Sequence, residues 1–249
     1  MVLPEFVKVN KLLIEDMLGL KKGDTMLIPV SAGIPEAYDI ALSAQAYAES
    51  IGVKADIITI APFKPGDPPN KELTAAAKEV NGLYQMASFH ALDLKITFDK
   101  LKIPMIYVGD SPGTDESLIR TMLRVDPYKM RDEGWKIAEA FTEANTARIT
   151  TRTGTDYTED ISGIVGEALS GFACDPKGTP WEYVPGSCPG IVETRWGTAN
   201  GKVVYDDGPF QGAVLVIEGC RIVDVQGGPA GERLKHWLGD RIHDNNYIC

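Results

Sequence analysis

The hydrophobic pattern of the first half of the chain alternates between helical periods and short, continuously apolar runs. Residues 25–30 and 53–60 are such runs, which are typical of strands covered on both faces of a sheet. Between them, residues 35–50 begin with a proline suited to the first turn of a helix and carry alanines at helical spacing. The three segments predict a β-α-β unit with a right-handed crossover, and therefore a parallel sheet.

Further elements of both kinds follow in this half. Helices are predicted for residues 4–18, 71–86, 116–123 and 126–144, and strands for residues 92–98 and 104–108. Alternation of helices with buried strands indicates an α/β domain. We assign this domain to residues 1–145.

From Ala147 onward, short runs rich in Thr, Val and Ile replace the long helical periods. Strands are predicted for residues 148–151, 191–196, 202–205, 213–217 and 221–225, and a helix begins in residues 232–238. The Pro/Gly-rich stretch 174–190 is either a lid or a connection. The fold class is therefore α/β, in which an N-terminal parallel-sheet domain precedes a mostly antiparallel, β-rich (α+β) domain at residues 146–249.

Two stretches of the second half have the pattern of a strand, a tight turn and a returning strand. Residues 147–163 alternate Thr and Ile up to Arg152, break at 153–156, and resume as a Thr/Tyr-rich run. Residues 191–206 repeat this pattern and break at 197–201, where an Asn-Gly pair suits the positive φ of a two-residue turn. We expect two hairpins whose Arg, Asp, Glu and Asn side chains wall a site.

Charge and composition narrow the classes of function. The net charge of −10 argues against a nucleic-acid partner, because affinity for phosphates depends on clustered Lys and Arg. No apolar run reaches the ~18 residues of a membrane-spanning helix, and the amino terminus does not resemble a secretory leader. We expect a cytoplasmic protein that binds neither nucleic acid nor membrane.

Cysteine and histidine offer few metal ligands. The four cysteines form no CxxC pair, which favours ordinary thiols over a zinc or redox site. The three histidines have no HxxxH or HExxH spacing, so a helical His-based site cannot be built locally. His90 lies in an apolar run and is expected to be a core or boundary residue rather than a ligand. His243 could serve as a ligand only with groups from elsewhere.

The order of the motifs resembles that of a known enzyme family. Residues 152–158 (RTGTDYT) precede residues 197–201 (GTANG), and Gly227 and Gly228 stand ahead of a helix, all behind an α/β half. This arrangement is similar to the aminopeptidase T family of thermophilic metallo-aminopeptidases. The related iron-dependent 2,5-dihydroxypyridine dioxygenases look similar over the same stretches. The resemblance covers most of the chain and implies the same α/β and β-rich halves.

The resemblance implies a hydrolase that removes amino-terminal residues from small peptides with metal-activated water. Its cofactor would be a divalent metal, Zn, Co or Mn. In the alternative, Fe(II) would support cleavage of a small hydroxylated ring. Family members continue past the end of this chain and carry most of their ligands there, so we expect an incomplete site and no activity of the chain alone. A homo-oligomer is consistent with the family, and a non-catalytic remnant or binding module is a third alternative.

Glu193 is the candidate metal ligand. In the peptidases, a first ligand Glu lies between the Pro/Gly-rich loop and the Asn-Gly hairpin, and Glu193 is the only carboxylate there, although it lies closer to the turn than in the family. In the dioxygenase branch this position is a His. No His stands between Gly178 and Gly201, which counts against ring cleavage.

Arg152, Asp156 and Asn200 are the candidate substrate-binding residues. Arg152 would hold a substrate carboxylate by a two-pronged hydrogen bond, while Asp156 would hold an amino group. In the structural alternative, Asp156 caps the Thr-Gly turn through its own backbone, as Asp readily does. For Asn200, the structural alternative of a turn residue and nothing more is favoured.

Overall fold

The computed structural model describes residues 4–62, 64, 67–88, 92, 102–109, 114–184, 188–191 and 195–239. The chain divides into two compact units, Met1–Trp135 with Ala168–Pro189, and Lys136–Glu167 with Gly190–Cys249. The chain therefore leaves the first unit, returns to it and leaves it again. Within the described part, no helix is both long and apolar enough to cross a membrane.

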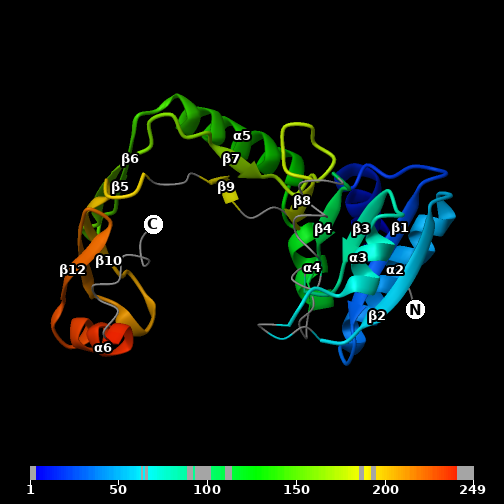
Figure 1. Ribbon diagram of the computed structural model, residues 1–249, viewed down its shortest axis with the longest axis horizontal. Helices are drawn as coiled ribbons and strands as arrows, with labels where there is room; N and C mark the ends of the chain where they lie inside the picture. Colours follow the sequence, from blue (N-terminus) through cyan, green and yellow to red (C-terminus); the bar gives the residue numbers. More distant parts are fainter. Residues whose placement is uncertain are drawn as a thin grey trace. The chain divides into compact units, whose positions relative to one another are not determined.

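The first unit contains a five-stranded parallel sheet in the order β2-β1-β3-β4-β8 (Figure 1). Its strands are β1 (Thr25–Ser31), β2 (Lys54–Ile60), β3 (Gly82–Gln85), β4 (Met105–Tyr107) and β8 (Trp181–Tyr183). β1 is buried over nearly its whole length, because both faces of the sheet are covered. The predicted parallel sheet is confirmed.

Helices cover both faces of this sheet. They are α1 (Pro4–Lys11), which continues as a π-helical turn (Leu12–Met17), α2 (Pro35–Ser50), α3 (Lys71–Ala77) and α4 (Thr114–Met122). A further helix, α5 (Pro127–Glu143), begins in the first unit and ends in the second. One core cluster joins α1, α2 and α4 to Ile28, Tyr84 and Ile106 of the sheet. A second cluster joins α3 to Leu83 and Met105, whose side chains alternate with those of the first cluster along β3 and β4.

Two sequence-based assignments in the first unit are wrong. The helix predicted for residues 71–86 ends at Ala77, and Gly82–Gln85 forms the fully buried strand β3. The Pro/Gly-rich stretch 174–190 is neither a lid nor a plain connection, because Trp181–Tyr183 is the fifth strand of the parallel sheet. The strand predicted for residues 92–98 lies outside the described residues, apart from Leu92.

The second unit is built on a five-stranded antiparallel sheet in the order β12-β11-β10-β6-β5. Its strands are β5 (Thr146–Thr150), β6 (Asp156–Asp160), β10 (Asn200–Val204), β11 (Val214–Glu218) and β12 (Arg221–Gln226). Helix α6 (Gly228–Leu238) contributes Ala230, Leu234 and Leu238 to a core with Ile217, Ile222 and Val225. A separate two-stranded sheet pairs β7 (Glu167–Leu169) with β9 (Cys188–Ile191). The predicted antiparallel, β-rich part is confirmed.

The first predicted hairpin is confirmed, whereas the second is wrong, because β10 pairs with β6 and β11 rather than with residues 191–196. Of that predicted strand, residues 192–194 lie outside the described residues, and Arg195 and Trp196 form no strand. β5 and β6 pair in register from Thr146 opposite Asp160 to Thr150 opposite Asp156. Asn200 and Gly201 are not turn residues, because they open β10 and pair with Thr158 and Tyr157 of β6. A turn precedes β10, and Gly197 has a positive φ of 83° there.

Candidate functional site

Two of the candidate residues, Asp156 and Asn200, lie on the same polar face of the antiparallel sheet. Thr150, Asp156, Lys202, Val216 and Asp224 lie opposite one another along a single row across all five strands. Arg148, Thr158 and Asn200 form the next row on this face, since residues two apart along a strand point to the same side. Asp156 and Asn200, singled out from the sequence, therefore share one surface.

Asp156 is held by a side chain that the sequence did not single out. Arg148 Nε and Nη2 donate to Asp156 Oδ1 and Oδ2 at 2.8 and 2.9 Å, which is a two-pronged contact across the hairpin. These hydrogen bonds lower the pKa of Asp156 below its ordinary value, and the charge of Lys202 acts in the same direction. The predicted turn cap is therefore wrong: Asp156 opens β6 and binds Arg148.

Asp156 nevertheless stays accessible. Its side chain is 47% exposed, and that of Arg148 is 62% exposed. A carboxylate oxygen can accept more than one hydrogen bond, so both oxygens retain capacity for a donor from solution. Arg148, Asp156 and Lys202 thus form an exposed group of alternating charge that could orient an amino group or a carboxylate.

The side chain of Asn200 is occupied by the protein itself. Its Nδ2 donates to the carbonyl of Thr198 at 2.8 Å, and its Oδ1 accepts from the backbone nitrogen of Gly219 at 3.0 Å. These bonds tie the start of β10 to the turn between β11 and β12. The structure thus gives Asn200 a structural role that a local turn signal could not show.

Arg152 lies in the turn that follows β5. It is exposed, and among the described residues no hydrogen bond or ion pair of its side chain is found. The turn is closed by a bond from Thr151 N to Thr155 O and by Gly154, whose φ is 109°. Arg152 thus remains able to bind an external carboxylate.

Glu193 lies outside the described residues, and so do His90 and His243. Across the described part of the chain, no group of three or more His, Cys, Asp or Glu side chains could hold a metal ion. A divalent site requires several such groups to converge. These residues do not supply that ligand set, and the role of Glu193 stays a prediction.

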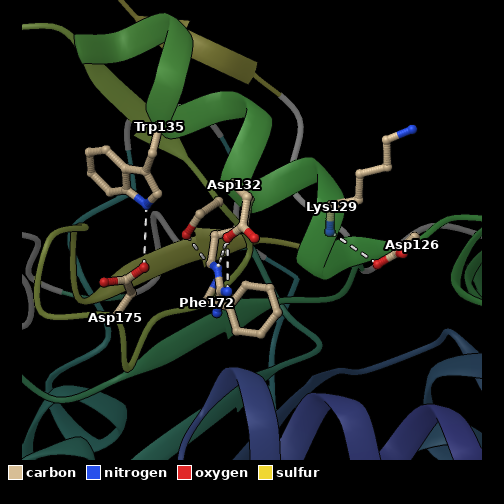
Figure 2. Close-up of polar contacts among 8 residues, drawn as sticks. Asp126, Lys129, Asp132, Trp135, Phe172 and Asp175 are labelled. Atoms are coloured by element: carbon tan, nitrogen blue, oxygen red, sulfur yellow. Dashed lines mark hydrogen bonds and ion pairs between the residues drawn. The ribbon is translucent and has the colours of Figure 1, made fainter.

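The first unit contains a second chemically unusual group, Glu182 on β8. Its side chain is fully buried, and Oε1 has no hydrogen-bond partner. Glu182 packs against the segment that includes Ser170 and Asp175, and its Oε2 accepts a hydrogen bond from Gly171 N in this segment. Helix α5 also contacts this segment, because Trp135 Nε1 donates to Asp175 Oδ2 at 3.3 Å (Figure 2). Burial raises the pKa of Glu182 to about 7. Sequence alone gave no sign of this group, because Glu182 stands within a Pro/Gly-rich stretch.

Described residues of the first unit also line open cavities, among them the following two. One, of about 480 Å³, lies where β2 ends and α3 begins and is lined by Ile60, Asp67 and Asn70 among others. The other, of about 670 Å³, lies where the strands begin and is lined by Lys21, Asp24 and Asp175 among others. Neither cavity contains Asp156, Asn200 or Arg152.

The two sheets define a protein with an α/β unit and an antiparallel β unit, and a solved structure shares this arrangement. The chain is similar to wild-type AmpT from Thermus thermophilus, with a TM-score of 0.58 and 12% sequence identity. The match covers 94% of this chain and 74% of AmpT. The chain thus has the aminopeptidase T-like fold that its motifs predicted.

Other comparisons add no further assignment. A fatty acid ABC transporter substrate-binding protein from Thermomonospora curvata gives a TM-score of 0.31 and 16% identity over 46% of this chain and 31% of that one. Such a low score carries no conclusion about fold or function. No family model and no curated protein matches the sequence.

Proposed function

We propose that this protein is an aminopeptidase T-like hydrolase that acts on the amino-terminal residue of small peptides with a divalent metal ion. The observation that carries the proposal is the match of its fold to AmpT over 94% of the chain. The ordered RTGTDYT and GTANG motifs, in the same β-rich part of the sequence, support it.

The polar face of the antiparallel sheet is suited to binding the charged groups of a peptide. The exposed carboxylate of Asp156 is an acceptor for an amino group, although it shares its oxygens with Arg148. Arg152 is a donor for a carboxylate. Asn200 shapes this surface through Gly219 rather than by binding the substrate.

The metal ligands are the part of the proposal that this chain leaves open. Among the described residues, no three such ligands come together. The roles that we propose for Asp156 and Arg152 are binding and orientation of the substrate. We propose that turnover needs further ligand groups, with Glu193 as one contributor, and that the chain alone does not hydrolyse peptides.

Two measurements on the purified protein test these statements. Aminoacyl-nitroanilides with added cobalt, zinc or manganese are expected to give no turnover above a protein-free blank, while a leucine aminopeptidase serves as positive control. In calorimetry with the same ions, a short peptide with a free amino group is expected to bind more tightly than its N-acetylated form. Clear turnover that chelation removes would contradict the incomplete site. Equal binding of the two peptides would contradict aminopeptidase-type recognition.

A further inference from the structure

β5 forms one edge of the antiparallel sheet and is exposed on both of its faces. Within the described sheet it pairs with β6 alone. Thr146, Arg148, Ile149 and Thr150 are all exposed, and Ile149 retains 54% of its accessible surface. An edge strand that presents regular backbone to solvent is a template for pairing with another extended chain.

The direction of the free backbone groups follows from two hydrogen bonds at the ends of the hairpin. Ile161 N donates to Asn145 O at 3.0 Å, and Thr151 N donates to Thr155 O at 3.1 Å. In an antiparallel pair, alternate residues turn their N–H and C=O toward the neighbouring strand. Residues of odd number therefore bond to β6, and the N–H and C=O groups of Thr146, Arg148 and Thr150 point to the outer edge.

The opposite edge of the same sheet is protected, whereas β5 is not. On β12, Ile222 pairs with Ile217 and Asp224 pairs with Val216, so Val223 is the extra residue of a bulge. Bulges of this kind disfavour pairing at an edge. The register of β5 with β6 is continuous over all five residue pairs, and β5 contains no proline.

Charge decides which occupant suits this edge. If β5 of a second copy paired antiparallel with this β5 over its full length, Arg148 of one copy would lie opposite Arg148 of the other. Like charges that face each other across paired strands are destabilising. Two copies of a chain with a net charge of −10 also repel each other. Arg152, two residues beyond Thr150, is instead an exposed donor for a carboxylate at the end of this edge.

From this geometry we infer that β5 is a docking strand for an extended peptide, whose backbone bonds to Thr146, Arg148 and Thr150 and whose terminal carboxylate binds Arg152. The peptide then runs parallel to β5, because its carboxyl end lies at the end of β5. The inference rests on the proposed peptide-directed function and identifies a surface that holds the carboxyl-terminal part of an extended peptide, separate from the amino-group contact proposed at Asp156. It involves neither a metal nor the free amino group.

The test measures metal-free binding of an N-acetylated peptide of alternating valine and threonine with a free carboxyl group, by calorimetry on the full chain. Thr150→Pro removes one outward N–H without touching the bonds to β6, and Thr150→Val is the matched control that keeps this N–H. Binding is expected to weaken roughly tenfold or more in the proline variant and to change little in the valine variant. Equal affinity of the two variants overturns the inference.

Two further experiments separate the contribution of the peptide backbone to binding from that of its terminal carboxylate. N-methylation of alternate peptide residues removes the peptide's own donors, and it is expected to abolish binding to the unaltered protein even if Thr150→Pro fails to fold. Arg152→Gln is expected to weaken binding of the free-acid peptide while leaving the weaker C-terminal amide unchanged.

The alternative occupant is tested by sedimentation without peptide. A dimer of the unaltered chain that Thr150→Pro dissociates overturns the inference in favour of a second copy. The probe is acetylated and no hydrolysis is followed, so a negative result here does not contradict the proposed function. That function is tested separately by the nitroanilide assay and by the comparison of free and acetylated peptides.

Discussion

The carboxylate of Glu182 accepts a hydrogen bond from the backbone nitrogen of Gly171 at 3.0 Å through Oε2, while its Oε1 is buried without a hydrogen-bond partner. Burial is the main cause that raises the pKa of Glu182 from 4.5 to about 7, and the hydrogen bonds from Gly171 and Ser170 oppose it. The group is therefore predominantly neutral in the folded protein below about pH 7. An ionised Glu182 would carry an unpaired charge into the core between β8 and its covering segment.

Glu182 is expected to lower the stability of the first unit as the pH rises. Between pH 4.5 and about 7 the folded protein holds a proton that the unfolded chain has released, so the free energy of unfolding falls across this range. The full loss is about 3 kcal/mol and is reached above the folded pKa. In urea unfolding followed by tryptophan fluorescence, Glu182→Gln is expected to gain stability relative to the unaltered protein as the pH increases from acid to neutral.

Glu79→Gln supplies the control, because Glu79 is an exposed carboxylate of the same unit. It controls for the removal of one negative charge from this unit. If the effect of Glu182→Gln changes with pH no more than that of Glu79→Gln, the buried carboxylate does not govern the pH dependence.

The elements that local pattern predicted correctly are those whose burial follows from their own residues. β1 is apolar over its length because it lies inside the sheet, and α2 is framed by Pro35 and by the turn at Gly52. β8 could not be found in this way. It has only three residues, with Glu182 at its centre, and it exists because Met105–Tyr107 offers a free edge to a segment that returns after the chain has passed through the second unit.

The same distinction applies to the candidate site. Asp156 and Asn200 were found as polar residues next to turns, but their partners depend on the pairing of strands. Arg148 reaches Asp156 diagonally across the hairpin, and Gly219 reaches Asn200 from the next turn of the sheet. Once the strand register is known, the alternation of side chains along β5 and β10 places Arg148 and Lys202 on the same face as Asp156.

Gly201 is expected to tolerate no side chain. An added Cβ would lie 2.1 Å from the carbonyl oxygen of Asp156, and the φ of Gly201 is 131°. Gly201 lies on β10, the central strand of the sheet, so both the steric clash and the backbone strain would fall there. Gly201→Ala is therefore expected to destabilise the second unit by about 3 kcal/mol or more in thermal or urea unfolding.

Gly197→Ala separates the two causes. Gly197 also has a positive φ of 83°, but nothing lies within 4 Å of an added Cβ. Its substitution is expected to cost about 1 kcal/mol from conformation alone. A loss at Gly201 no larger than that at Gly197 would show that β6 moves aside to accept the methyl group.

Asn200 is expected to act on stability rather than on binding. Asn200→Ala leaves the backbone nitrogen of Gly219 without its acceptor and is expected to cost about 1 kcal/mol. Asn200→Asp retains an acceptor oxygen and is expected to recover part of this loss. Melting temperature and peptide affinity should be measured together for both variants. Weaker peptide binding by both, at an unchanged melting temperature, would restore the substrate-binding role predicted from the sequence.

Arg148 is expected to control the ionisation of Asp156. The hydrogen bonds from Arg148 are the largest cause of the lowered pKa of Asp156, and Lys202 contributes less. Arg148→Gln is therefore expected to raise the pKa of Asp156 toward its ordinary value, measured by NMR titration of the side-chain carboxyl carbon. Lys202→Gln is the control on the same row of the sheet and is expected to raise it less. The stability of the protein should change little in either variant, because the pair is exposed and solvent screens it. An equal rise in both variants would mean that Asp156 responds to the summed positive charge of this face rather than to its two-pronged contact with Arg148.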